Sequence, residues 1–300
     1  MYSQVDANKR RTLYLFFFFA LVVIGVGWAF SYIYNSPIIL VIAVIIAVVQ
    51  SWFSYYFADS VALAVAGAVE APVAQFPELH HVVENLAITA GLPKPRVYVI
   101  DDPAPNAFAT GRNTTHAAVA VTTGLLAIMS KTELEGVLAH ELSHVKNYDI
   151  LVMTVAVTLV GAIVLISDIF LRSLWWGGGR RSNSDNDNSA GWLMIIGIVL
   201  AILAPIFGQL IQLAISRKRE YLADASGVLL TRYPEGLASA LVKIEKFEKP
   251  MRRVNRATAH LFINEPYGVD DEKVKANWFT TLFSTHPPIQ DRIKKLQEMA

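Results

Sequence analysis

Two long uncharged stretches near the N-terminus constrain this chain most strongly. Leu13 to Tyr34 contains 22 residues without a charge, and Ile38 to Ala58 contains 21. Each is long enough to cross a bilayer as a helix. A cleaved signal peptide is the alternative, but its apolar region would be only about 7–15 residues long. We therefore predict a transmembrane hairpin in residues 1–57, with a tight turn at 35–37.

Two more apolar stretches follow in the middle of the chain. Leu151 to Leu171 is interrupted only by Asp168, and Trp192 to Ile215 has 24 residues without a charge. We predict a second transmembrane hairpin in residues 151–215, whose loop 172–191 is rich in Gly, Ser and Asn and expected to be flexible. Buried core helices are the alternative. Asp168 could mark an ion pathway or lie hydrated at the membrane interface.

The other two parts, 58–150 and 216–300, are more polar and form the predicted protease domain. The first contains short strand-like runs and the second is largely helical in pattern. The predicted strands are 96–100, 106–109 and 117–122, and the predicted helices of the first part are 76–90, 124–129 and the one that follows. The expected fold class is therefore an α+β membrane protein, mainly helical, with a small sheet.

The composition limits which metal ligands and binding partners the chain can have. The chain has no cysteine, so disulfides and thiolate metal sites are excluded, and any metal must be held by histidines and carboxylates. Its net charge of +1 indicates no nucleic-acid partner.

The sequence His140-Glu141-Leu-Ser-His144 is an H-E-x-x-H motif. On a helix, His140 and His144 lie on one face and can share a tetrahedral zinc ion. Glu141 lies beside that face, where it can take a proton from a zinc-activated water. Ser130 and Glu133 form a capping box ahead of a helical apolar pattern, which gives the motif the helix it needs. The alternative is a surface helix with two unrelated histidines.

A catalytic zinc needs a third protein ligand, and Glu220-Tyr-Leu-Ala-Asp224 can supply it. Glu220 would bind the metal, completing a His₂Glu site. Asp224, one turn later, would accept the free N–H of a zinc-bound histidine. Two solvated acids at the start of a basic helix are the alternative.

These paired motifs resemble the HtpX family of bacterial integral-membrane zinc endopeptidases. The resemblance also includes Pro105 to Gly111, Ala118 to Leu126 and Ser284 to Pro287. It implies one Zn²⁺ per chain, a gluzincin-like protease domain, peptide-bond hydrolysis, and a role in quality control of membrane or misfolded proteins. The family is related to membrane proteases that process prenylated proteins.

The distribution of charge predicts the orientation. With four spans, the N-terminus and both polar parts share one side, and that side carries 23 of the 26 Lys and Arg residues. The positive-inside rule weighs short loops most, and here it compares the basic Lys9-Arg10-Arg11 before the first span with the neutral turn 35–37 after it. This comparison decides the orientation. We predict a multi-pass protein of the cell inner (plasma) membrane with a cytoplasmic catalytic domain.

Three further features have open roles. His286, held before two prolines, could donate to the oxyanion of the reaction or be structural. Asp149 is expected near the end of the motif helix, bound to local backbone or to Lys146. The strand 117–122 could pair with an extended substrate or be purely structural.

The leading function is a zinc endopeptidase that faces the cytoplasm and cleaves membrane or misfolded proteins. A narrow-specificity protease of lipid-modified peptides is one alternative. A metal carrier or scaffold is another, but a carrier has no use for Glu141 as a base.

Overall fold

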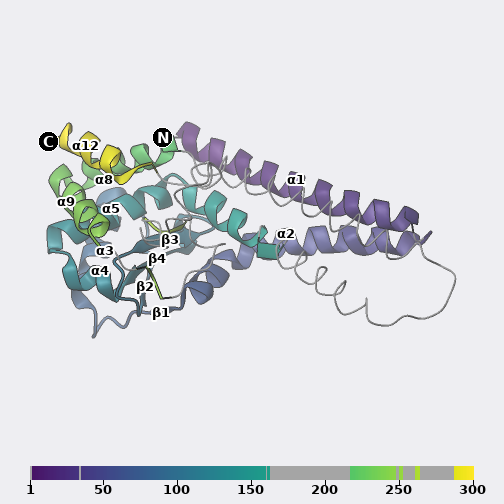
Figure 1. Ribbon diagram of the computed structural model, residues 1–300, viewed down its shortest axis with the longest axis horizontal. Coiled ribbons are helices and arrows are strands. Elements are labelled where there is room, and N and C mark those ends of the chain that lie inside the picture. Colours follow the sequence, from purple (N-terminus) through teal and green to yellow (C-terminus); the bar gives the residue numbers. More distant parts are fainter. Residues whose placement is uncertain are drawn as a thin grey trace.

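Two long helices project from an α+β head in this computed structural model (Figure 1). The structure describes residues 2–33, 35–159, 161–162, 217–247, 250–252, 261–263 and 287–300. The head contains a four-stranded sheet with helices packed against it. The α+β class and the small sheet are confirmed.

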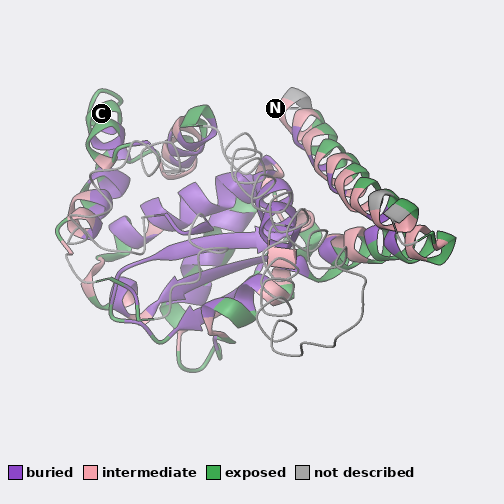
Figure 2. Ribbon diagram, turned by 45° about the vertical axis from the view of Figure 1, so that its right-hand side comes forward, coloured by how far each residue is buried: buried purple, intermediate pink, exposed green. Residues whose placement is uncertain are grey.

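The projecting helices α1 (Tyr2–Ile33) and α2 (Pro37–Ala66) form a hairpin (Figures 1 and 2). They approach closely where Gly27 faces Ala43, because a Cβ on Gly27 would lie 2.1 Å from the Ala43 Cβ. Small residues of this kind are typical of helix contacts in membranes. Large apolar side chains on the hairpin remain exposed, among them Leu13, Phe17, Leu21, Ile42, Ile45 and Val49. In the described part of the chain, these two helices are long and apolar enough to cross a membrane.

Of the third and fourth predicted membrane segments, the structure describes only the start of the third. A shorter apolar helix, Asp149–Leu159, begins the third segment and packs its Leu151, Val155 and Leu159 against Phe19 of α1. Residues 163–216, which include Asp168, the loop 172–191 and the fourth segment, lie outside the described residues.

The sheet has the strand order β1-β2-β4-β3. The strands are β1 (Ala68–Glu70), β2 (Arg96–Ile100), β3 (Ala107–Gly111) and β4 (Ala117–Thr122). β2 and β4 are parallel, whereas β1 and β3 are antiparallel to their neighbours. Of the two roles considered for 117–122, pairing with a substrate at a sheet edge is excluded, because β2 and β3 take up both edges of β4, and the structural role remains. The short edge strand β1 was not predicted.

Strands β3 and β4 are buried on both faces, and the two faces of the sheet pack against different parts of the chain. Val97, Val119 and Val121 face a core built with α3 (Pro77–Ala90), α5 (Lys131–Lys146) and α9 (Pro234–Glu245). Phe108, Ala118 and Ala120 face the end of α2 and the helix Asp149–Leu159. Because successive side chains of a strand point to opposite faces, one face packs against the helices of the head and the other against the end of the hairpin.

The helix that carries the H-E-x-x-H motif is α5, and its start is fixed as predicted. The Ser130 side chain accepts from Glu133 N, while Glu133 Oε2 accepts from Ser130 N at 2.7 Å. Glu133 also pairs with Lys243 of α9 at 2.6 Å. Burial raises the pKa of Glu133, but Lys243, Ser239 and Ser130 outweigh it and lower that pKa to about 2. This ionised cap sets where α5 begins, nine residues before His140.

Candidate metal centre

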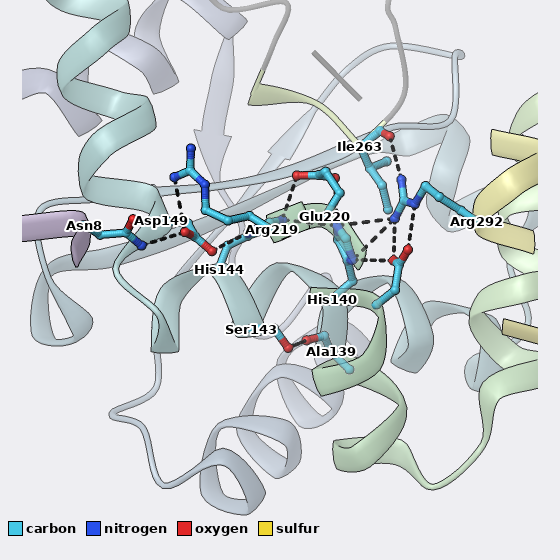
Figure 3. Close-up of polar contacts among 11 residues, drawn as sticks. Asn8, Ala139, His140, Ser143, His144, Asp149, Arg219, Glu220, Ile263 and Arg292 are labelled. Carbon is cyan, nitrogen blue, oxygen red and sulfur yellow. Dashed lines mark hydrogen bonds and ion pairs between the residues drawn. The ribbon is translucent and has the colours of Figure 1, made fainter. Parts of the chain in front are cut away.

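The two histidines of the motif converge on one point. His140 and His144 lie one turn apart on α5, both buried, and their Nε2 atoms are 3.2 Å from each other (Figure 3). The ring planes are perpendicular, with centroids 4.8 Å apart.

Glu220 completes the cluster from α8 (Arg217–Thr231). Its Oε2 lies 3.7 Å from His140 Nε2, and its Oε1 lies 3.5 Å from His144 Nε2. α8 can come this close because Gly227 lies against the backbone of α5, where a Cβ would be 3.1 Å from His140 N. The sequence-predicted ligands His140, His144 and Glu220 are thus brought together, with one donor atom from each within 4.8 Å of the others.

These separations fit a tetrahedral zinc. Donors bound at about 2.0–2.1 Å to one tetrahedral ion lie roughly 3.3 Å apart. The two imidazole nitrogens, 3.2 Å apart, are close to that value, and each lies 3.5–3.7 Å from a different oxygen of Glu220. Glu220 is 1% exposed, so its carboxylate is shielded from solvent. Two imidazoles and one carboxylate with an open fourth position are a catalytic zinc donor set.

Asp224 lies against His140, in the contact that the sequence suggested for it. Its Oδ1 lies 2.9 Å from His140 Nδ1. Arg292 of α12 (Ile289–Gln297), fully buried, donates to both Asp224 oxygens at 2.9 and 2.7 Å. Burial raises the pKa of Asp224, but Arg292 and His140 lower it to about 2. The ionised carboxylate can only accept, so the imidazole proton is on Nδ1 and Nε2 is left for the metal.

Asp149 does the same for His144, which the sequence interpretation missed. Its Oδ2 lies 3.1 Å from His144 Nδ1, so the prediction that it binds local backbone or Lys146 is wrong. Its other oxygen, Oδ1, accepts from Asn8 of α1 at 2.7 Å and from Arg219 at 3.3 Å (Figure 3). The signal was available, because Asp149 follows His144 by five residues. Arg292 and Asn8 lie far from their aspartate partners in sequence, and no spacing linked them to the site.

The charges around the site favour a cation. Burial lowers the pKa of His144, but Glu220, Asp149 and Glu141 raise it to about 9. Both Nδ1 atoms face aspartates and both Nε2 atoms face the same place, so at neutral pH without a metal a proton is held between the imidazoles. Metal binding must displace any proton held at that position.

Glu141 is buried at 3% exposure and follows His140 directly on α5. Its charge acts on His144 and on Arg292, which places it next to the cluster. It is not one of the three converging ligands. His286 lies outside the described residues.

Comparisons with known proteins agree with this geometry. A model of Peptidase family M48 matches residues 73–300. A protein named Protease HtpX homolog from Caldanaerobacter subterraneus subsp. tengcongensis is 47% identical over 301 residues, covering 100% of this chain and 98% of that protein. Another from Streptococcus uberis is 43% identical and covers 100% of both chains. The chain belongs to the HtpX family of M48 peptidases.

HtpX membership makes the chain a membrane metalloprotease. A solved structure, S. mikatae Ste24p, shares the fold with a TM-score of 0.51 and 19% identity. The match covers 99% of this chain and 67% of that one. It extends the likeness of the fold from the head to the apolar helices.

Replacing Asp224 or Asp149 by alanine should weaken zinc binding in this HtpX-family chain by roughly 10–100-fold, the usual effect of removing a carboxylate that orients a metal-bound histidine. Asp224→Ala also leaves Arg292 buried without its partner, so it should lower the melting temperature further than Asp149→Ala. Chelator competition and thermal unfolding measure the two effects. Asp291→Ala on α12 is the matched control, because Asp291 is exposed. Wild-type zinc affinity in both variants would contradict the assigned roles.

Proposed function

We propose that this protein is a zinc-dependent endopeptidase that cleaves membrane-bound or misfolded membrane proteins at the cytoplasmic face of the plasma membrane, in protein quality control. The observation that carries the proposal is the position of the metal centre beside the apolar hairpin. Asp149, bound to His144, contacts Asn8 of α1. Asn8 is five residues before Leu13, where the uncharged stretch begins, or about 7–8 Å along a helix.

The orientation follows from the same hairpin. The start of α1 and the end of α2 both lie at the head (Figure 1). If the hairpin spans the bilayer, the head and Lys9-Arg10-Arg11 are on one side, which the positive-inside rule assigns to the cytoplasm.

The chemistry can be assigned to residues of the chain. Zinc held by His140, His144 and Glu220 would supply a water of lowered pKa and polarise the scissile carbonyl. Glu141 is the carboxylate placed to accept a proton from the attacking water and to return it to the leaving amine. Asp224 and Asp149 keep each histidine in the Nδ1-protonated form. The burial of the cluster limits competing water.

We expect such a site to prefer substrates in the same membrane. A peptide bond must be extended and near the headgroups to reach Glu141, and a membrane anchor raises its effective concentration there. The test compares one unstructured sequence as a free peptide and as a segment tethered to a transmembrane helix, in the same liposomes containing the enzyme. Faster cleavage of the tethered form is expected. Equal rates at matched bulk concentration would contradict the proposal.

A third substrate form in the same experiment distinguishes this proposal from its main alternative. The same sequence ending in a lipid-modified cysteine would be cleaved best by a narrow-specificity protease of lipid-modified peptides. Comparable rates for the lipid-modified and the helix-tethered forms are expected for a general membrane endopeptidase.

A further inference from the structure

We propose that Asn8, near the start of α1, is a positioning residue for the metal centre, so that the first apolar helix is a structural part of the site. The inference rests on the proposed zinc function. Asn8 is fully buried, although it lies near the N-terminus on a helix that is otherwise largely exposed. A polar side chain buried this completely needs partners for all of its donors and acceptors.

The amide of Asn8 is fully used. Its Nδ2 donates to Asn147 O at 2.9 Å and to Asp149 Oδ1 at 2.7 Å. Its Oδ1 accepts from Arg11 Nη1 at 2.9 Å, which fixes which end of the amide points to Asp149. Both Nδ2 hydrogens are thus directed at the segment that joins α5 to the next helix.

That junction decides where Asp149 lies. α5 ends at Lys146, and Tyr148 then has a φ of 60°, a left-handed conformation that is uncommon for an aromatic residue. The turn brings Asp149 back beside His144. Helix α1 contacts the turn at two more points. Asn8 binds the Asn147 carbonyl, and Lys9 Nζ lies 5.1 Å from the centroid of the Tyr148 ring.

The two oxygens of the Asp149 carboxylate have different partners, and Asn8 binds one of them. Because the amide binds Oδ1, Oδ2 remains directed at His144 Nδ1. Asn8 adds no charge beside Asp149, whereas Arg219 forms an ion pair with the same Oδ1. Arg219 reaches the same Oδ1 only at 3.3 Å, and its Nε and Nη2 have no hydrogen-bond partner in the structure as described. Arg219 is therefore poorly placed to fix the carboxylate alone.

The consequence is a chain of contacts from the first apolar helix to a zinc ligand, Asn8 to Asp149 to His144. A displacement of α1 along its axis would break the bonds to Asn147 and Asp149 together. Zinc affinity should therefore depend on a side chain that touches neither metal nor substrate.

The test uses the full-length protein in detergent micelles, with zinc affinity measured by chelator competition and the visible spectrum of the Co²⁺-substituted protein as a reporter of ligand geometry. Asn8→Ala should lower zinc affinity about tenfold, the lower end of the effect of removing such support, and should alter the cobalt bands. Asn8→Asp should lower it further, because it places a carboxylate against Asp149. Gln4→Ala, one turn earlier on α1, is the matched control and should leave affinity unchanged.

A double-mutant cycle distinguishes positioning from general destabilisation. In an Asp149→Ala background, Asn8→Ala should have no further effect on zinc affinity, because the two side chains act in series. Wild-type zinc affinity and cobalt spectrum in Asn8→Ala, or losses that add in the double variant, would overturn the inference. A fall in melting temperature alone would also overturn it. Absence of zinc binding by the wild-type protein would instead overturn the proposed function, and this inference with it.

Discussion

Glu141→Gln is expected to abolish peptide-bond hydrolysis while the protein keeps its zinc. Glutamine has the same shape as glutamate but cannot accept a proton from water at neutral pH. General-base catalysis contributes roughly 10²–10⁴-fold to rate, so a loss of at least that size is expected. The metal should remain because the ligands are His140, His144 and Glu220, and Glu141 is not among them.

The measurement pairs proteolysis of a membrane-tethered substrate with zinc content by elemental analysis. Glu135→Gln, on the same helix and only partly buried, is the control and should behave as the wild type. Loss of zinc from Glu141→Gln would make Glu141 a ligand. Full activity with zinc bound would remove it from the mechanism, and a zinc-loaded wild type without activity would support a metal carrier.

Glu220→Ala should have the second largest effect, by removing the only carboxylate among the three ligands. The two histidines on α5 would remain, but two imidazoles hold zinc far more weakly than a His₂Glu set. The expected loss of affinity exceeds about 100-fold, the upper end of the effect of removing a residue that only supports a ligand. Activity should fall with the metal.

Elemental analysis after dialysis against a mild chelator measures this effect. Glu235→Ala, at an exposed position in the first turn of α9, is the control for removing one carboxylate. Full retention of zinc by Glu220→Ala would exclude Glu220 from the site. Partial retention similar to that of Asp224→Ala would give Glu220 a supporting role instead.

The parts of the site that sequence could predict are those set by local spacing. The positions of His140 and His144 follow from one helical turn, and the capping box at Ser130 and Glu133 fixed the start of that helix. Glu220 and Asp224 follow from the same periodicity on a second helix. The strands 96–100 and 117–122 were predicted with their observed limits, because each is a short apolar run bounded by turn residues.

The parts that sequence could not predict depend on contacts between distant segments. Arg292 reaches Asp224 across 68 residues, and Asn8 reaches Asp149 across 141. Arg292 shares the apolar face of α12 with Ile293 and Leu296, which marks it as buried but does not identify Asp224 as its partner. The interior place of β4 likewise depends on strand order, which a strand's own sequence does not encode.

The central claim is that two imidazoles and one carboxylate of this chain hold a zinc ion with an open position for water. X-ray absorption at the zinc edge of the purified full-length protein tests it most directly. The account predicts one zinc per chain, bound by two imidazole nitrogens and by oxygen donors at about 2.0–2.2 Å. A zinc-free protein, or a zinc shell with one imidazole or none, would contradict it.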